Sequence, residues 1–386
     1  MNYPRYKLGD VAQIVTGSTP SKAREVFWGG SIPFVTPAEL DGDEPVSKAA
    51  VYVTDLGAVE ARVVPVNSIM VCCIGSLGKV GIAGCDLITN QQINTLIFDE
   101  NKVYFKYGYH FCKTLKPYLD HIAPSTTVAI VNKSRFSEIE IPLPPLEEQK
   151  RIAAILDKAD SLRRKRAQAI ALADDFLRAT FLEMFGDPVT NPKGWQQSTL
   201  NELCEKIQIG PFGTQLHQED YISGGIPLVN PTHIVKGSIC PDSNLTVRPE
   251  KYAELTEYHL KLGDIVVGRR GEMGRCALVT EMEDGYLCGT GSLFLRVGRG
   301  GVLPEFLERV ISSKSAKRFF EQASLGATMP NLNKTIVGNF SFGVPPLDLQ
   351  EKFLQIICKI KSQIDTQMVS WDELKILSAS LTENFD

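Results

Sequence analysis

The chain of 386 residues lacks the features of a membrane protein, a secreted protein or a protein that coats nucleic acid. No hydrophobic run reaches the length of a membrane span. The N-terminus, MNYPRYKLGDVAQIV, has no apolar stretch between basic residues and a small-residue cleavage site. A formal net charge of −4 argues against binding of nucleic acid through charge alone. We therefore expect a cytoplasmic protein, without a membrane partner, in which any contact with nucleic acid is local or shared.

Paired cysteines and metal-binding motifs are missing as well. The nine cysteines are an odd number and include no C-x-x-C pair. No histidine stands at ligand spacing from them, so free thiols in a reducing compartment are the expected state and no metal site is predicted.

Motifs of catalysis are also absent. The nearest match to a P-loop, residues 75–80, lacks two loop residues and the hydroxyl that holds Mg²⁺. The chain has no H-E-x-x-H, no G-x-S-x-G and no G-x-G-x-x-G after a strand. Both Pro-Pro pairs run into Leu, whereas the amino-methyltransferase signature has an aromatic residue there. The five histidines have no evident serine or carboxylate partner, so we expect neither a catalytic residue nor a bound cofactor.

What the chain does contain is a duplication. Residues 126–146 read TTVAIVNKSRFSEIEIPLPPL, and residues 327–347 read ATMPNLNKTIVGNFSFGVPPL. SIPFVTPAELDG at residues 31–42 likewise corresponds to GIPLVNPTHIVKG at residues 225–237. One unit of globular part plus helix has therefore been repeated and fused, as a first copy and a second copy.

Each globular part is rich in short β-branched runs bounded by Gly, Asn and Asp, which are typical of strands. A long helical pattern follows each of them, so the predicted class is α+β with two similar strand-rich domains. The predicted boundaries are residues 1–143 for the first domain, 144–185 for the first helical region, 186–344 for the second domain and 345–386 for the second helical region.

Each helical region has apolar residues spaced three and four apart, which define one helix face. A helix that spans either helical region would extend beyond a small domain. We therefore expect the two helices to pair as an antiparallel coiled coil, with a pseudo-two-fold relation between the copies. An ordinary helical hairpin packed against a neighbouring domain remains the alternative. The residues predicted to lie between the helices or to bind a partner are Ile152, Ile155, Leu162, Leu177, Phe353, Ile360, Ile364 and Leu374.

Short loops with Gly, Asn, Gln and basic residues occupy equivalent places in both copies. Arg and Lys suit guanine, Asn and Gln suit adenine, and Ser and Thr suit phosphates, so these loops are candidates for reading DNA. Their glycines match while the residues between them differ, which suits two different short sequences. The alternative is that such residues only form the turns of a β-domain. The candidates are Ser18, Lys22, Ser76, Lys79, Gln91, Gln92, Asn132, Lys133, Gln215, Arg269, Arg270, Arg275, Thr290, Asn333 and Lys334.

The whole chain resembles the specificity subunits of Type I restriction-modification systems. The resemblance rests on two I-P-[FL]-V blocks, the paired N-K and P-P-L segments and the helix opening LEEQKRI. Phe185-Gly186-Asp187-Pro188, followed by NPKGW at residues 191–195, adds to it.

This resemblance implies two target recognition domains that read the halves of a split, asymmetric sequence in double-stranded DNA. It also implies two methyltransferase subunits and a restriction and translocase subunit as partners, with S-adenosylmethionine, ATP and Mg held by those partners. The chain itself would have no catalytic group. Two alternatives stay open at this point: a self-sufficient DNA-modifying enzyme, and a coiled-coil adaptor between proteins.

Overall fold

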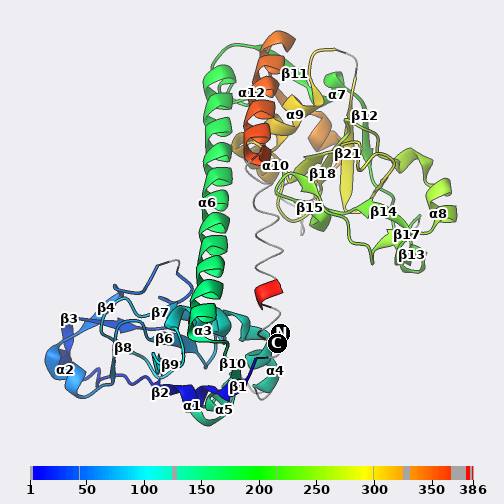
Figure 1. Ribbon diagram of the computed structural model, residues 1–386. Coiled ribbons are helices and arrows are strands. Elements are labelled where there is room, and N and C mark those ends of the chain that lie inside the picture. Colours follow the sequence, from blue (N-terminus) through cyan, green and yellow to red (C-terminus); the bar gives the residue numbers. More distant parts are fainter. Residues whose placement is uncertain are drawn as a thin grey trace. The chain divides into compact units, whose positions relative to one another are not determined.

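The computed structural model of the protein divides into two compact units. Unit 1 comprises Met1–Gln168 with Thr366–Asp386, and unit 2 comprises Ala169–Asp365. Both combine short strands with helices (Figure 1). Unit 1 therefore contains both ends of the chain. The structure describes residues 3–42, 44–123, 128–213, 215–298, 300–324, 331–366, 380–382 and 385.

Unit 1 contains two four-stranded sheets and a two-stranded ladder. Its elements before the long helix are β1 (Arg5–Lys7), α1 (Leu8–Val11), β2 (Ala12–Thr16), η1 (Glu25–Phe27), β3 (Trp28–Val35), β4 (Val51–Val53), α2 (Asp55–Val59), β5 (Val63–Val64), β6 (Ile69–Cys72), β7 (Val80–Ile82), β8 (Leu87–Thr89), β9 (Ile93–Phe98), α3 (Phe105–Thr114), α4 (Lys116–Ile122), α5 (Lys133–Ser137) and β10 (Glu140–Pro142).

The central sheet of unit 1 has the strand order β2-β9-β6-β7, and the second sheet has the order β4-β3-β8-β5 with β3 and β8 parallel. Successive side chains of a strand point to opposite faces, and β6 is buried on both. Ile69 and Val71 pack with Tyr107 of α3, whereas Met70 and Cys72 pack with residues of β3, β5 and β8. This burial explains why the sequence of β6 is continuously apolar rather than alternating.

Unit 2 contains a similar but longer series of elements after the long helix. Its elements are β11 (Gln196–Thr199), α7 (Leu200–Leu203), β12 (Cys204–Ile209), η2 (Gln218–Asp220), β13 (Tyr221–Ile222), β14 (Ile226–Val229), η3 (Pro231–His233), β15 (Ile234–Val235), β16 (Ser238–Ile239), β17 (Thr246–Val247), α8 (Pro249–Glu254), η4 (Thr256–Tyr258), β18 (Ile265–Gly268), β19 (Cys276–Leu278), β20 (Leu287–Cys288), β21 (Ser292–Val297), α9 (Pro304–Ile311), α10 (Lys314–Ala323), α11 (Lys334–Gly338), β22 (Ser341–Val344) and α12 (Leu347–Thr366).

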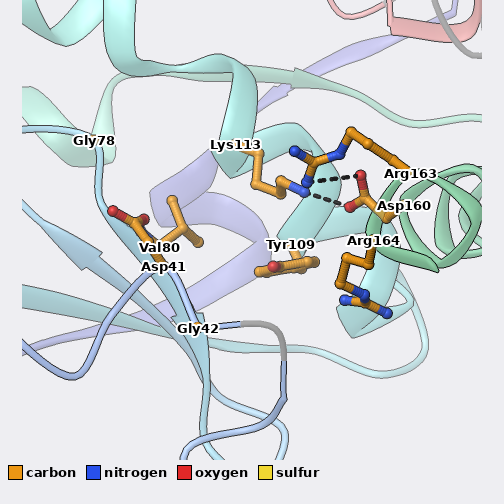
Figure 2. A pocket seen from close by; sticks show the side chains of 9 residues that line it. All are labelled: Asp41, Gly42, Gly78, Val80, Tyr109, Lys113, Asp160, Arg163 and Arg164. Atoms are coloured by element: carbon orange, nitrogen blue, oxygen red, sulfur yellow. Dashed lines mark hydrogen bonds and ion pairs between the residues drawn. The ribbon is translucent and has the colours of Figure 1, made fainter. Parts of the chain in front are cut away.

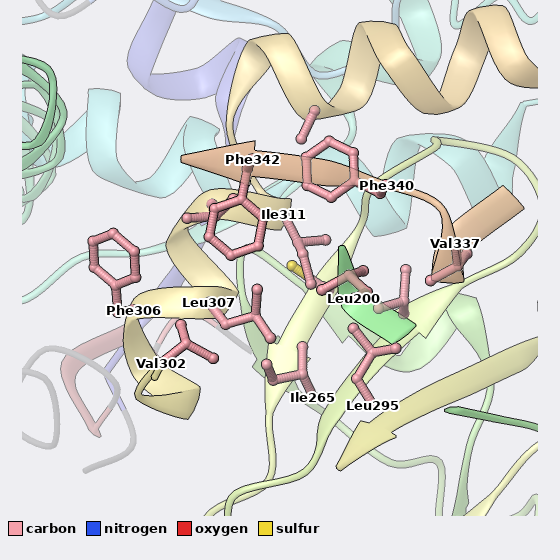
Figure 3. Packing of buried hydrophobic residues seen from close by; sticks show 14 of the residues in the cluster. Leu200, Ile265, Leu295, Val302, Phe306, Leu307, Ile311, Val337, Phe340 and Phe342 are labelled. Atoms are coloured by element: carbon pink, nitrogen blue, oxygen red, sulfur yellow. The ribbon is translucent and has the colours of Figure 1, made fainter. Parts of the chain in front are cut away.

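The central sheet of unit 2 matches that of unit 1, whereas its second sheet has the order β13-β17-β14-β20 and a further two-stranded sheet, β15-β16, is added. The central sheet has the order β12-β21-β18-β19, and the second sheet contains a parallel pair, β14 and β20. The ladder β11–β22 corresponds to β1–β10. In the core, Phe306, Leu307 and Ile311 of α9 belong to the same cluster as Ile265 and Leu295 of the central sheet (Figure 3).

The long helix α6 (Leu146–Phe185) has 40 residues, and α12 has 20. Within unit 2, the ring centroid of Phe353 at the start of α12 lies 5.5 Å from those of Phe181 and Phe185 at the end of α6. The end of one helix therefore meets the beginning of the other, so the two segments run antiparallel there.

Near the C-terminal end of the chain, Phe385 packs against α3 of unit 1 as Phe185 packs against α9 of unit 2. The ring centroid of Phe385 lies 5.4 Å from that of Tyr107 and 5.7 Å from that of Phe111, both on α3. In unit 2, Phe185 lies 4.9 Å from Phe306 of α9 by the same measure. Phe385 thus fills in unit 1 the place that Phe185 fills in unit 2, so each body receives the end of the other copy's helical region.

Of the residues predicted to lie between the helices or to bind a partner, three are buried in the cores of the two units. Ile152 is buried in unit 1, and Leu177 and Phe353 are buried in unit 2. Leu374 lies outside the described residues. The half-buried members are Ile155, Leu162, Ile360 and Ile364.

One buried glutamine fixes each helix to its own body. Gln149 accepts a hydrogen bond from the Tyr104 amide (Oε1 to N, 2.9 Å) and donates to the Lys102 and Pro144 carbonyls (each 2.9 Å). The hydrogen bonds satisfy a polar group that would be costly to bury alone.

Gln350 repeats this set in the second copy. It accepts from the Leu303 amide (2.9 Å) and donates to the Gly301 and Pro345 carbonyls (3.0 and 2.8 Å). The glutamine that follows each Pro-Pro-Leu therefore links body and helix in the same way.

The predicted α+β class, with two similar strand-rich bodies and a long helix between them, is confirmed; the second of the two predicted helices is described as α12, over Leu347–Thr366. The residue boundaries of the four predicted segments remain a prediction. Of the helices in the described ranges, none combines the length and apolar character that crossing a bilayer requires.

Candidate nucleic-acid interface

Four loops of unit 1 that are far apart in sequence are joined by backbone hydrogen bonds. The Gly17 amide donates to the Ile93 carbonyl (3.0 Å), the Cys73 amide to the Gln92 carbonyl (2.8 Å), and the Val131 amide to the Cys73 carbonyl (2.9 Å). These bonds place the loops at one edge of the central sheet. The joined loops contain residues 17–22, 73–79, 90–92 and 129–133.

The same bonds recur in unit 2. The Gly210 amide donates to the Ser292 carbonyl (2.9 Å), the Arg269 amide to the Gly291 carbonyl (3.0 Å), and the Leu332 amide to the Arg269 carbonyl (3.0 Å). Cys73 and Arg269 thus occupy equivalent backbone positions. The loops that the sequence selected in each copy therefore do come together.

The glycines that match between the copies have matching conformations. Gly75 and Gly78 have φ of 78° and 75°, and Gly271 and Gly274 have φ of 79° and 73°. Positive φ is readily adopted by glycine and rarely by other residues. The turn therefore keeps its shape while Ile74 in one copy becomes Arg270 in the other.

In unit 1 the predicted glutamines belong to a polar network. Gln91 accepts a hydrogen bond from the Thr19 hydroxyl (Oγ1 to Oε1, 2.7 Å). The Gln92 side chain accepts a hydrogen bond from the Asn90 side chain (Nδ2 to Oε1, 2.9 Å) and donates to the Ile74 carbonyl (3.3 Å). Gln91 is exposed and Gln92 is half-buried, so Gln92 holds the loops together while Gln91 faces solvent.

The remaining candidates of unit 1 lie around this network. Ser18 is half-buried and its backbone amide donates to the Thr89 carbonyl (2.9 Å). Lys79 is half-buried, with its Nζ 3.7 Å from Oδ2 of Asp41. Lys22, Ser76 and Lys133 are exposed.

Among the candidates of unit 2, the exposed cations are Arg270 and Lys334. Gln215 is exposed as well, and its Oε1 accepts from the Tyr258 hydroxyl (2.9 Å). Thr290 is half-buried.

Arg275 is held by its own domain. Its Nη2 lies 3.0 Å from Glu272 Oε2, and its Nη1 donates to the Pro231 carbonyl (3.2 Å). Hydrogen bonds from Lys317 and Arg275 lower the pKa of the Glu272 carboxyl, which stays ionised beside the loop.

Arg269 points into the domain. Its side chain is buried, and its Nε donates to the Leu332 carbonyl (2.7 Å). Burial lowers the pKa of the Arg269 guanidinium, and the neighbouring charge of Arg270 lowers it further. The structure therefore gives Arg269 a role in fixing the loop that ends at Leu332.

Asn132 and Asn333 cap short helices. The Asn132 Oδ1 accepts from the Arg135 amide (2.9 Å), and the Asn333 Oδ1 accepts from the Ile336 amide (2.8 Å). Asn is among the preferred residues at this position. The matched N-K pair is thus a cap followed by an exposed lysine in both copies.

Sequence reasoning missed Arg62. This exposed residue donates from Nη1 to the Thr16 carbonyl (2.8 Å), at the end of β2, and brings a cation to the rim of the unit 1 loops. It stands alone between Ala61 and Val63, and no motif or match between the copies marks it.

The histidines make contacts that belong to the fold. His110 Nε2 lies 2.9 Å from Asp157 Oδ1, His233 Nδ1 lies 2.9 Å from the Leu228 carbonyl, and the His259 ring stacks on Tyr252. Among the described residues, no three side chains of His, Cys, Asp and Glu gather as a metal-binding group.

The cysteine thiols are poor nucleophiles where they are buried. Burial raises the pKa of Cys73 and of Cys204 to about 12. Such thiols are protonated at neutral pH, and it is the thiolate that reacts.

Comparison with known proteins gives a family match over most of the chain. The model of the Type I restriction modification DNA specificity domain matches residues 2–172 and again residues 192–370. The chain is 27% identical over 379 residues to the MjaIX specificity subunit of Methanocaldococcus jannaschii, a match that covers 91% of this chain and 85% of that protein. It is 32% identical over 173 residues to the HindI specificity subunit of Haemophilus influenzae, with 42% and 38% covered.

Among solved structures, the fold is similar to a Type I restriction-modification S subunit from M. genitalium. The TM-score is 0.64 at 18% identity, and the match covers 100% of this chain and 96% of that one. A likeness at this identity concerns the fold.

Proposed function

Because the chain belongs to the Type I restriction modification DNA specificity family, we propose that it selects the DNA sequence on which a Type I restriction-modification complex acts. Each copy reads one half of a split, asymmetric target, and the chain performs no chemistry itself. The functional segments are a first recognition domain at residues 1–143, a helical region at 144–185, a second domain at 186–344 and a second helical region at 345–386.

The observation that supports this function most strongly is that the two copies have the same backbone hydrogen bonds in their loops but different loop side chains. The amide and carbonyl of Cys73 and of Arg269 make equivalent hydrogen bonds, yet the exposed turns that follow begin with Ile74 in one copy and Arg270 in the other. Base edges are read by side chains, so equal frames with unequal side chains suit two different half-sites.

We propose two roles for the candidate residues. The residues proposed to position the loops, in keeping with their hydrogen bonds inside the domain, are Gln92, Asn132, Arg269, Arg275 and Asn333. The residues proposed to reach bases or phosphates are Ser18, Lys22, Ser76, Lys79, Gln91, Lys133, Gln215, Arg270, Thr290 and Lys334.

The length of α6 suits this function because the helix can hold two reading domains at least one DNA turn apart. A helix of 40 residues is about 60 Å long, and half-sites one DNA turn apart are separated by about 34 to 36 Å. Two methyltransferase subunits and a restriction and translocase subunit complete the proposed cytoplasmic complex. S-adenosylmethionine, ATP and Mg belong to those partners, and the target adenine is flipped out of the duplex there.

The proposed function is tested by selecting bound duplexes from a randomised pool, with the chain alone and with the methyltransferase subunit of the same operon. We expect enrichment of two short half-sites at a constant spacing. Binding without any sequence preference, or no binding with either preparation, would contradict the proposal and favour a protein adaptor.

A second assay separates the proposal from a self-sufficient enzyme. The purified chain is incubated with duplex DNA, S-adenosylmethionine, ATP and Mg²⁺, and methyl transfer and strand cleavage are measured. We expect no turnover until the partner subunits are added; turnover by the chain alone would contradict the proposed role.

A further inference from the structure

Unit 1 contains a polar cavity of about 220 Å³ between α3, α6 and two turns of the recognition domain (Figure 2). Tyr109 and Lys113 line it from α3. Beside α3, α6 contributes an acid and two neighbouring arginines, and the turns that contain Asp41 and Gly78 lie across from them (Figure 2). The charged lining residues are Asp41, Lys113, Asp160, Arg163 and Arg164.

The charges of this cavity are organised around Asp160. Lys113 Nζ forms an ion pair with Asp160 Oδ2, and Arg163 Nη2 lies 3.6 Å from Asp160 Oδ1. Lys113 Nζ also lies 5.4 Å from the centroid of the Tyr109 ring. The Arg163 side chain is 61% exposed, so its guanidinium remains accessible to an anion despite the neighbouring carboxylate.

The cavity adjoins the candidate reading loops. Gly78, which lines it, belongs to the same turn as Ser76 and Lys79. A Cβ on Gly78 would lie 2.6 Å from the Cβ of Lys116 on α4, so this turn is pressed closely against the helices. An extended polyanion that meets the turn would therefore reach the arginines of α6 within a short distance.

The second copy has different charges at the corresponding positions. Lys236 takes the place of Asp41, and both residues adopt positive φ, 50° and 66°. Counted from the two Pro-Pro-Leu segments, Lys361 replaces Asp160 and Ile364 replaces Arg163. The second copy thus keeps the turn and the helix with other side chains at these positions.

This difference bears on what the cavity binds. Two identical partner subunits on two related copies would meet similar surfaces. The two halves of an asymmetric DNA target differ, so the surfaces that bind them need not be similar. A charge set found in one copy therefore favours DNA over a partner subunit as the occupant.

We propose that this cavity of unit 1 binds a backbone phosphate of DNA, held by Arg163 and Arg164, beside the half-site that the first copy reads. The proposal rests on the proposed function. The planar guanidinium matches two phosphate oxygens at once, and the pair of arginines on one helix turn gives the site its charge. Phosphate contacts position the protein and carry no base information.

The test measures DNA affinity of the chain with its methyltransferase subunit across 50 to 200 mM salt, on target and on random duplex. Each phosphate contact contributes about 0.9 to the slope of log affinity against log salt. We expect R163A/R164A to reduce the slope by about 1 on both duplexes, because one phosphate contact is lost, without changing the preferred bases. R163K/R164K should retain most of the slope.

The matched control is K158A/K165A, which removes two positive charges from exposed positions of α6 in the same unit, neither of which lines the cavity. Equal slopes for R163A/R164A and this control, with both complexes intact, would overturn the proposal.

Two further outcomes separate the proposal from its premise. If R163A/R164A weakens assembly with the methyltransferase subunit and leaves the salt slope unchanged, the cavity binds protein and the proposal is wrong. If the unaltered complex shows no sequence preference on any duplex but R163A/R164A still lowers its slope, the phosphate site stands and the proposed function fails.

Discussion

Gln149 and Gln350 make the same three hydrogen bonds in the two copies, whereas Cys73 and Arg269, also at equivalent positions, carry different side chains. The first pair joins body to helix, and the second stands at the loop edge. The duplicated unit has therefore kept the contacts that join body to helix and changed side chains in the loops that we propose to face DNA.

The cavity of unit 1 and the central sheets show the same contrast between shared backbone and different side chains. The strand order of the central sheet is identical in both units, while Asp41, Asp160 and Arg163 of unit 1 have counterparts of different charge. If stability depends on the shared residues and DNA recognition on the divergent ones, as we propose, variants of the two sets should have separable effects.

The largest expected effect concerns the aromatic residues that end each helical region. Phe385→Ala should destabilise unit 1 and Phe185→Ala unit 2, each by about 3 to 5 kcal/mol, because each ring packs against aromatic side chains in a buried cluster. Hydrogen exchange of peptides from each unit under increasing denaturant measures both.

Leu172→Ala is the control, since this α6 side chain is 72% exposed. If Phe385→Ala left the protection of unit 1 unchanged, the equivalence of Phe385 and Phe185 would be wrong.

The next effect concerns the buried glutamines. Gln149→Leu and Gln350→Leu should each cost about 2 to 3 kcal/mol, because one amide donor and two carbonyls lose their partner in the interior. Thermal or denaturant unfolding measures the loss. Gln168→Leu, at an exposed position of α6, is the control. A large loss for one glutamine alone would break the comparison between the copies.

A smaller effect is expected at the loop edge. Arg270→Ala should relax base preference in the second half-site only, by about 1 to 3 kcal/mol, because a guanidinium that reads a base loses its hydrogen bonds. Ile74→Ala should alter the first half-site only. Salt-controlled binding to duplexes changed in one half measures both.

Arg178→Ala serves as the control for charge, since its side chain is 57% exposed on α6. Unchanged affinity and unchanged preference in the Arg270→Ala variant would refute the assignment of Arg270.

The smallest effect should come from the helix caps. Asn132→Ala and Asn333→Ala should each cost about 1 kcal/mol of stability, because the amides of Arg135 and Ile336 lose their acceptor. Asn132→Ser and Asn333→Ser, which retain an acceptor, should recover most of it. A change in base preference in the serine variants would instead identify these residues as direct DNA contacts.

The sequence predicted much of the fold because repetition is visible in it. The Pro-Pro-Leu segments, the matched glycines and the strand runs recur in order, and the structure places them in equivalent elements. Phe385 was not predicted, because its packing in unit 1 depends on contacts across almost the whole chain that no local pattern encodes.

The candidate site was predicted at the level of loops rather than side chains. Loop residues that position the backbone and loop residues that face solvent look alike in sequence. Asn132, which caps a helix, and Arg269, which is buried, therefore could not be distinguished from exposed residues such as Arg270. Arg62 was missed because it reaches the loops only through the fold.

The central claim, two divergent readers on one repeated frame, is tested most directly by mapping methylated adenines across the genome of cells that carry either the unaltered chain or its Arg270→Ala variant. We expect a split motif with a constant gap, in which the variant relaxes one half and leaves the other intact. A continuous motif, or a change in both halves at once, would contradict the account.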